Sequence, residues 1–108
     1  MSFPKRDEVW LVSLDPSRGS EIKKMRPCLI VSPDELNEWL RTAIIAPMTS
    51  TARQYPSRVE IRFRGKTGQV ALDQVRAVDR GRLVRKLGNL PTSVAESVSR
   101  VLVEMFTR

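Results

Sequence analysis

The sequence predicts a small, mainly β protein with some α structure, in which an antiparallel sheet curls or closes and a helix at the end of the chain packs on one side. Short segments rich in β-branched and apolar residues recur along the chain, separated by clusters of turn residues. The final segment instead places apolar residues at helical spacing. A chain of 108 residues can bury one modest core, so residues 1–108 are expected to form a single domain.

Three strands are predicted in the first half of the chain. The first covers residues 8–14 and ends in the turn residues 15–20. The second, 27–32, is a continuous apolar run typical of a buried strand, with a proline at its first position. The third covers 43–49, where a proline near the end indicates an edge or a bulge. Between the second and third strands, acids followed by apolar residues at helical spacing predict a short helix over 34–40.

The second half of the chain predicts two or three further strands, for a total of five or six. Residues 58–64 alternate charged and apolar side chains, which indicates a half-buried strand with one wet, basic face. Residues 65–68 have the composition of a hairpin turn, after which 69–78 resumes as a strand. A short strand over 83–87 ends at glycine and asparagine.

The last predicted element is an amphipathic helix. Its apolar positions are Val94, Val98, Val101, Leu102 and Met105. The segment 93–96 fits a capping box that begins at Ser93, and Thr92 is a rival cap.

Charge and composition limit the possible functions. Lys and Arg total 19 against 12 acids, a formal charge of +7, which favours an anionic partner such as nucleic acid or an acidic protein. The alternative is a basic protein that is merely soluble. The chain has no histidine and one cysteine, which excludes histidine-based proton transfer, Cys–His catalysis and a disulfide within the chain. We expect no metal site and no cofactor.

The chain is expected to be cytoplasmic. No apolar run is long enough to span a membrane. The first residues include basic side chains but no apolar segment or small-residue cleavage site, so they do not read as a signal peptide.

Two basic segments are candidate footprints for backbone phosphates, with solvated surface as the alternative for each side chain. The first contains Arg18, Lys23, Lys24 and Arg26 against Glu21, and the second contains Arg76, Arg80, Arg82, Arg85 and Lys86 against Asp79. Arg26 stands immediately before an apolar strand, where the chain enters the core. Because an arginine is costly to bury there, we expect its side chain to point into a groove.

Three polar residues stand at positions of interest on predicted strands. Thr49 and Ser50 place hydroxyls where a strand opens into a loop, and such hydroxyls commonly cap backbone groups. Asp73 lies in an otherwise apolar strand, where alternation puts it on the face opposite Gln74. A carboxylate there needs a partner, so Asp73 forms either a structural ion pair with an arginine or a functional contact.

Four segments, taken in order, closely resemble the MazF/PemK family of toxin endoribonucleases: residues 7–21, 26–33, 46–50 and 68–79. The resemblance covers nearly the whole chain. It implies an SH3-like antiparallel barrel that forms a homodimer and cleaves single-stranded RNA without a metal. It also implies a small acidic, MazE-like antitoxin that binds across the groove, with DNA contacted only indirectly through the antitoxin complex.

The resemblance carries over to individual residues. The essential arginine of the family falls on Arg26 and its essential threonine on Thr49. The Gly-Ser-Glu-Gln loop falls on residues 19–22, where Ile22 replaces the glutamine. The Kid/PemK branch has a histidine in that loop and an arginine two residues before Asp73, whereas this chain has Ser20 and Ala71 there. The chain is therefore assigned to the MazF branch.

RNA cleavage without metal or histidine can use the substrate's own 2′-OH as nucleophile, provided that the charge on the phosphoryl oxygens is stabilised. Arg26 suits that task, and Thr49 could add a hydrogen bond or orient the attacking oxygen. The base is Glu21 or Asp73, with Glu21 preferred. The loop 50–57 is the expected reader of RNA sequence. The full set of expected RNA contacts is Arg18, Ser20, Lys23, Lys24, Ser50, Arg53, Gln54, Tyr55, Asp73, Gln74 and Arg76.

Two other classes remain open because a fold alone does not set a function. A CcdB-like gyrase inhibitor depends on a Trp-Gly-Ile carboxyl end, whereas this chain ends Glu-Met-Phe-Thr-Arg. A plain RNA- or DNA-binding barrel would bind RNA through charge and leave it intact, so a nuclease assay separates it from an enzyme.

Overall fold

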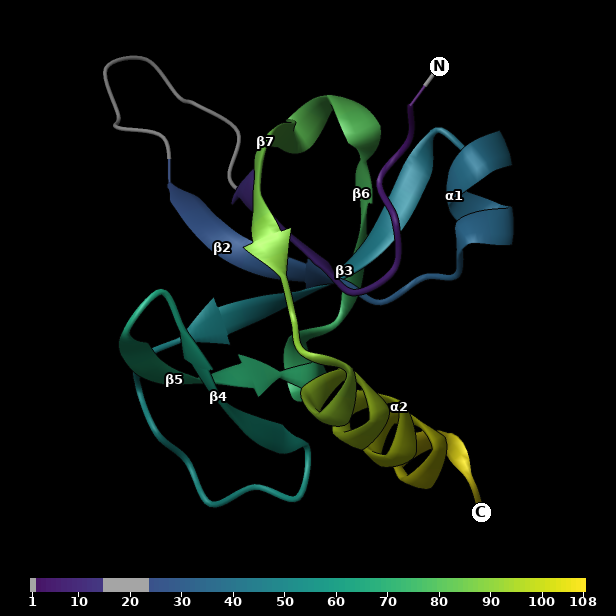
Figure 1. The fold of residues 1–108 in the computed structure, drawn as a ribbon. Coiled ribbons are helices and arrows are strands. Elements are labelled where there is room, and N and C mark those ends of the chain that lie inside the picture. Colours follow the sequence, from purple (N-terminus) through teal and green to yellow (C-terminus); the bar gives the residue numbers. More distant parts are fainter. Residues whose placement is uncertain (1, 15–23) are drawn as a thin grey trace.

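The computed structural model describes residues 2–14 and 24–108, and its core is a curled antiparallel sheet (Figure 1). The elements are β1 (Glu8–Ser13), β2 (Met25–Ile30), α1 (Asp34–Trp39), β3 (Thr42–Thr49), β4 (Arg58–Phe63), β5 (Lys66–Ala71), a 3₁₀ turn (Leu72–Gln74), β6 (Arg76–Asp79), a second 3₁₀ turn (Arg80–Arg82), β7 (Leu83–Asn89) and α2 (Thr92–Phe106). The predicted class, mainly β with a short helix after the second strand and a helix at the end, is confirmed. No helix in the described ranges is both long and apolar enough to cross a membrane.

The sheet curls because β3 changes partners along its length. The strand order is β4-β5-β3-β2-β1-β7, and β6 pairs with the other side of β3. The first part of β3 pairs with β2 and β6, up to the pair formed by Pro47 and Cys28. From Met48 onward, β3 pairs instead with β5. One strand thus belongs to two sheet layers, and its partner changes after Pro47, near the strand end where the proline was expected to mark an edge or a bulge.

The part of the chain that the structure describes has seven strands, so the expected number of five or six was too low. The predicted strand over 69–78 is broken by the 3₁₀ turn at Leu72–Gln74. The break is required because β5 pairs with one end of β3 and β6 with the other. Leu72 is fully buried in the core, and its N–H donates to the carbonyl of Ser57 at 3.1 Å. Strand alternation therefore does not place Asp73, which lies in the turn.

The β4–β5 hairpin turns earlier than expected. Arg64 and Gly65 both have positive φ, 52° and 77°, and Phe63 pairs with Lys66. This is a two-residue turn of the kind that matches the twist of the flanking strands. Lys66 therefore lies in β5 and not in the turn, which matters for the groove described below.

The helix α2 packs on the sheet through its predicted apolar face, with one exception. Ala95 and Val98 are buried, whereas Met105, near the end of the helix, is exposed. The predicted capping box does not form, and neither does the rival Thr92 cap. The helix instead follows Pro91, whose carbonyl accepts from the N–H groups of residues 94 and 95, and no side chain caps it.

The short helix α1 is turned the other way from the orientation that an apolar face would suggest. Asn37 is fully buried, while Trp39 is 80% exposed and Leu36 is exposed as well. The Asn37 amide donates to the carbonyl of Ser32 at 2.9 Å, and the Ser32 hydroxyl accepts from the N–H of Ile44 at 2.9 Å. These polar contacts join the helix to the loop before it and to β3, and they replace apolar packing there.

Candidate functional site

A groove of about 660 Å³ lies at the point where β3 leaves β2. The strand β2 begins at Met25, so Pro27 is its third residue. The sequence had predicted Pro27 as the first residue of the strand. Registered pairs between β2 and β3 begin only at Cys28. Met25, Arg26 and Pro27 therefore diverge from β3, and all three line the groove. The change of partner that curls the sheet also opens this groove.

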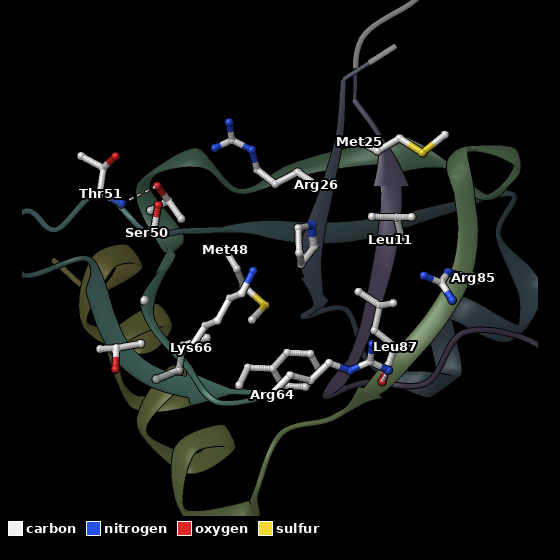
Figure 2. Close-up of a pocket in the computed structure, with 16 residues that line it drawn as sticks. Leu11, Met25, Arg26, Met48, Ser50, Thr51, Arg64, Lys66, Arg85 and Leu87 are labelled. Carbon is white, nitrogen blue, oxygen red and sulfur yellow. Dashed lines mark hydrogen bonds between the residues drawn. The ribbon is translucent and has the colours of Figure 1, made fainter. Parts of the chain in front are cut away.

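The groove is cationic. Four basic side chains line it from four elements: Arg26 from β2, Arg64 from the hairpin turn, Lys66 from β5 and Arg85 from β7. No acidic residue is among the described residues that line it. Figure 2 shows Arg26 extending along one rim toward Ser50, with Lys66 and Arg64 on the opposite side. A groove of one charge sign favours an anion with several charges along its length.

Thr49 and Ser50 form one end of the groove wall. The Thr49 Oγ1 accepts a hydrogen bond from the N–H of Thr51 at 3.1 Å, so the expected capping contact is present. A hydroxyl that accepts one bond still has its own proton to donate. Thr49 can therefore hold the loop and donate to a ligand at the same time.

A second cavity, of about 420 Å³, lies on the other side of Thr49. It is lined by Thr49, Thr51, Arg53, Tyr55, Arg58, Asp73 and Gln74. Thr49 lines both cavities, so a ligand in the groove can continue past it into the second cavity. Tyr55 is half exposed and lies on the loop that was expected to read RNA sequence.

Asp73 forms an ion pair with an arginine, which is one of the two roles that the sequence analysis allowed for it. Arg58 Nε lies 2.8 Å from Asp73 Oδ1, and Arg58 Nη2 lies 3.3 Å from Oδ2. The Ser57 hydroxyl also donates to Oδ1, at 2.9 Å. The bonds from Arg58 lower the pKa of Asp73 most; partial burial opposes them, and the Ser57 bond lowers the pKa further. A carboxylate with a lowered pKa is a weaker base, which disfavours Asp73 as the proton acceptor.

Several predicted site residues do not line the two cavities. Lys24, Gln54 and Arg76 are exposed and belong to neither cavity as described. Four further predicted residues, Arg18, Ser20, Glu21 and Lys23, lie outside the described residues.

The second basic segment was largely misread as a phosphate footprint. Arg80 donates to the carbonyls of residues 2 and 40, and Arg82 donates to the carbonyl of Ser13 at 3.2 Å. Lys86 pairs with Glu8 at 3.0 Å. Of this segment only Arg85 lines a described cavity. The side chains of Arg80, Arg82 and Lys86 are engaged by the protein's own carbonyls and carboxylate, whereas Arg76 is exposed.

Sequence reasoning missed Arg64, Lys66 and Arg58. The signal for Arg64 was the two-residue turn, which places it at the tip of the hairpin beside the groove, where its guanidinium donates to the Leu87 carbonyl. Lys66 follows Gly65 as the first residue of β5. Arg58 begins an alternating strand and was assigned to a wet face, although its side chain is only 6% exposed.

Comparison with known proteins shows the relationships of this chain. Residues 5–106 match the family described as PemK-like, MazF-like toxin of type II toxin–antitoxin system. Endoribonuclease PemK of Escherichia coli is 37% identical over 100 residues, covering 87% of this chain and 75% of that protein. Endoribonuclease EndoA of Bacillus subtilis is 31% identical over 104 residues, covering 91% and 90%.

Solved structures share the fold as well. MazF from Deinococcus radiodurans aligns with a TM-score of 0.79 at 28% identity, covering 97% of each chain. A MazE–MazF structure from the same organism aligns with a TM-score of 0.80 at 28% identity, covering 94% of each chain.

The curled sheet and its cationic groove, taken with these relatives, place the chain in the class of toxin endoribonucleases. The chain belongs to the PemK-like, MazF-like toxin family of type II toxin–antitoxin systems. Its assignment to the MazF branch stays a prediction, since PemK and EndoA relatives both match.

Proposed function

We propose that this toxin cleaves single-stranded RNA at preferred sequences, without a metal ion, as a single domain that acts in the cytoplasm. One observation carries the proposal: four cations and no described acid line a groove that ends at the Thr49 hydroxyl. The charges suit a phosphate backbone, and the curated relatives are endoribonucleases.

The proposed reaction is attack of the RNA 2′-oxygen on the adjacent phosphorus. A base takes the 2′-OH proton, the O2′–P bond forms as the P–O5′ bond breaks, and the departing 5′-oxygen takes a proton from water, giving a 2′,3′-cyclic phosphate and a 5′-OH. Arg26 stabilises the charge that builds on the phosphoryl oxygens, because guanidinium N–H groups bond more strongly to them as charge develops. Thr49 donates one further hydrogen bond. Glu21 is the proposed base, since the ion pair lowers the pKa of the rival, Asp73.

The second cavity is the proposed place where the sequence of the RNA is read. Splayed bases stack on aromatic rings and form hydrogen bonds through their edges. Tyr55 offers the ring, while Arg53 and Gln74 offer polar groups in the same cavity. Ser50 is a proposed RNA contact on the groove side, between Thr49 and Thr51, which line both the groove and this cavity. The exposed Lys24, Gln54 and Arg76, with Arg18, Ser20 and Lys23, complete the proposed contact set.

The proposed partners are a second copy of the chain and a small acidic antitoxin. A pair of MazF-like chains would join two grooves into one longer channel. Solved structures of MazE with MazF show that a relative forms such a complex. A MazE-like acidic segment would lie across this cationic groove and exclude RNA, with DNA contacted only through the antitoxin complex.

The test is incubation of the pure protein with a long single-stranded RNA in EDTA, with mapping of the product ends. The expected result is a limited set of cuts whose upstream fragments end in a cyclic phosphate. Cleavage that appears only after magnesium is added would contradict the metal-independent reaction. RNA that is bound but left intact would identify a plain binding protein.

A further inference from the structure

Gln69 is a polar side chain on the face of β5 that points away from the core, yet it is only 6% exposed. Its cross-strand neighbour on the same face, Glu60, is exposed. The difference arises from the loop 50–57, because Gln69 is bonded to the main chain of Arg53 within it. The loop covers Gln69 and leaves Glu60 in water.

The Gln69 side-chain amide forms two hydrogen bonds with the main chain of Arg53. The N–H of Arg53 donates to Gln69 Oε1 at 3.1 Å, and Gln69 Nε2 donates to the Arg53 carbonyl at 3.1 Å. Two reciprocal bonds of this kind reproduce the pairing of neighbouring strands, with a side chain in place of one strand. These two hydrogen bonds fix both the position and the orientation of the Arg53 backbone.

Arg58 adds further contacts between the loop 50–57 and the strands. Its Nη1 donates to Gln69 Oε1 at 3.3 Å and lies 3.5 Å from the carbonyl of Thr51. Its guanidinium also stands 5.2 Å from the centre of the Tyr55 ring. The ion pair with Asp73 holds Arg58 in place. The loop is therefore joined to β4 and β5 by polar contacts, of which those to Gln69 are partly buried.

The backbone of Gln69 is at the same time the strand partner of Thr49. One residue thus connects two parts of the site: its main chain pairs with the proposed catalytic threonine, and its side chain holds the loop that lines the second cavity. Any shift of the loop relative to Thr49 must break the Gln69 amide bonds.

We propose that Gln69 is a positioning residue that sets RNA sequence preference by holding the loop 50–57 in register with the cleavage site. This inference rests on the proposed function, since it presumes that the loop reads bases. Gln69 touches neither the scissile phosphate nor a base. Its loss should therefore lower discrimination between sequences and spare the chemical step.

The experiment compares cleavage of a preferred RNA with single-base variants of it, measured as kcat and KM for each. Preferred sites are first mapped with the wild-type protein on a long RNA. Gln69→Leu removes all three side-chain hydrogen bonds, Gln69→Asn is one methylene too short to make them, and Gln69→Glu keeps the acceptor while losing the donor. The matched control is Glu60→Gln, on the same strand pair and the same face. Glu60 forms none of the side-chain hydrogen bonds found among residues 2–14 and 24–108.

For Gln69→Leu and Gln69→Asn we expect the ratio of kcat/KM between preferred and variant RNA to fall on the order of tenfold, because three side-chain hydrogen bonds are lost. The kcat on variant RNA should stay near the wild-type value, and Gln69→Glu should give an intermediate ratio. Glu60→Gln should keep the wild-type ratio. Thermal unfolding of each variant identifies any that does not fold, and the remaining variants then decide.

Two results would overturn the role of Gln69 alone: a wild-type ratio in a folded Gln69→Leu or Gln69→Asn protein, or an equal fall of kcat on every RNA. The second result would mark a merely structural residue. A wild-type protein that cuts no RNA would instead refute the proposed function, and the specificity role with it.

Discussion

The backbone of Gly68 passes so close to Thr49 that a Cβ atom on residue 68 would lie 2.7 Å from the Thr49 carbonyl oxygen. Real Cβ atoms do not approach a backbone oxygen this closely, so one of the two strands would have to move. The side chain of Thr49 lines both cavities. The space left by one missing methyl group therefore sets the position of the proposed catalytic hydroxyl.

Gly68→Ala is expected to displace Thr49 and to reduce both stability and cleavage. Overpacking against backbone costs about 1–3 kcal/mol of unfolding free energy. The kcat should fall more than the affinity for RNA, because the cations of the groove are untouched. Gly65→Asn is the control, since open space surrounds Gly65 and Asn tolerates its positive φ. A folded Gly68→Ala protein with wild-type kcat would show that Thr49 has room to move.

Arg26→Ala is expected to lower kcat by on the order of 10²-fold, because a donor to the transition-state charge is lost. Arg62→Ala removes the same charge from an exposed site on β4 that lines neither described cavity. Single-turnover cleavage of the same RNA by both variants separates a local effect from a general loss of charge. Equal rates for the two variants would remove Arg26 from the site.

Glu8 is expected to make the free energy of unfolding depend on pH. Burial raises the pKa of Glu8, but bonds from the Lys5 N–H, Trp10 and Lys86 together outweigh it, so the pKa lies below its ordinary value of 4.5. The ionised carboxylate therefore stabilises the fold above pH 4.5, and this contribution is lost as the pH falls through the lower, folded-state pKa. Urea unfolding of wild type and Glu8→Gln should differ most near neutral pH and converge in acid. A difference that stays constant down to strong acid would contradict this assignment.

Cys28 is expected to be inert in the folded protein. The side chain is fully buried, and burial raises the pKa of its thiol to about 12, against the opposing charges of Arg26 and Arg76. Only the thiolate reacts with alkylating reagents, so very little is available at pH 8. Iodoacetamide should modify the denatured chain and leave native protein and its activity unchanged. Rapid native labelling would mean that β2 opens readily.

Helices and strands were predicted correctly where the local residue pattern agreed with the tertiary contacts of the segment. The alternating strand β4 and the apolar face of α2 around Val98 follow from burial on one side of each element. The break after Ala71 could not be predicted, because the residues there read as one apolar strand. Only the two separate partners on β3 require the chain to turn at that point.

The site was predicted in part for the same reason. Arg26 was expected to face a groove because an arginine is costly at the entry to a core, and it lines one. Arg58 and Gln69 could not be recognised, since each occupies a position that reads as solvent-facing. Their burial depends on a loop that folds back over the outer face of the hairpin, a contact between segments that no local pattern encodes.

The orientation of α1, with its apolar side chains toward solvent, affects the fluorescence of the two tryptophans. Trp39 projects into water at 80% exposure, whereas the indole N–H of Trp10 donates to Glu8 at 3.0 Å on the strand β1. A soluble quencher such as acrylamide should therefore reach Trp39 first, while the emission of Trp10 should follow the protonation of Glu8. As described, α1 contributes no side chain to either cavity. A protein partner that covers α1 would shield Trp39 from the quencher, and an RNA confined to the groove would not, so one fluorescence titration can tell which surface has been occupied.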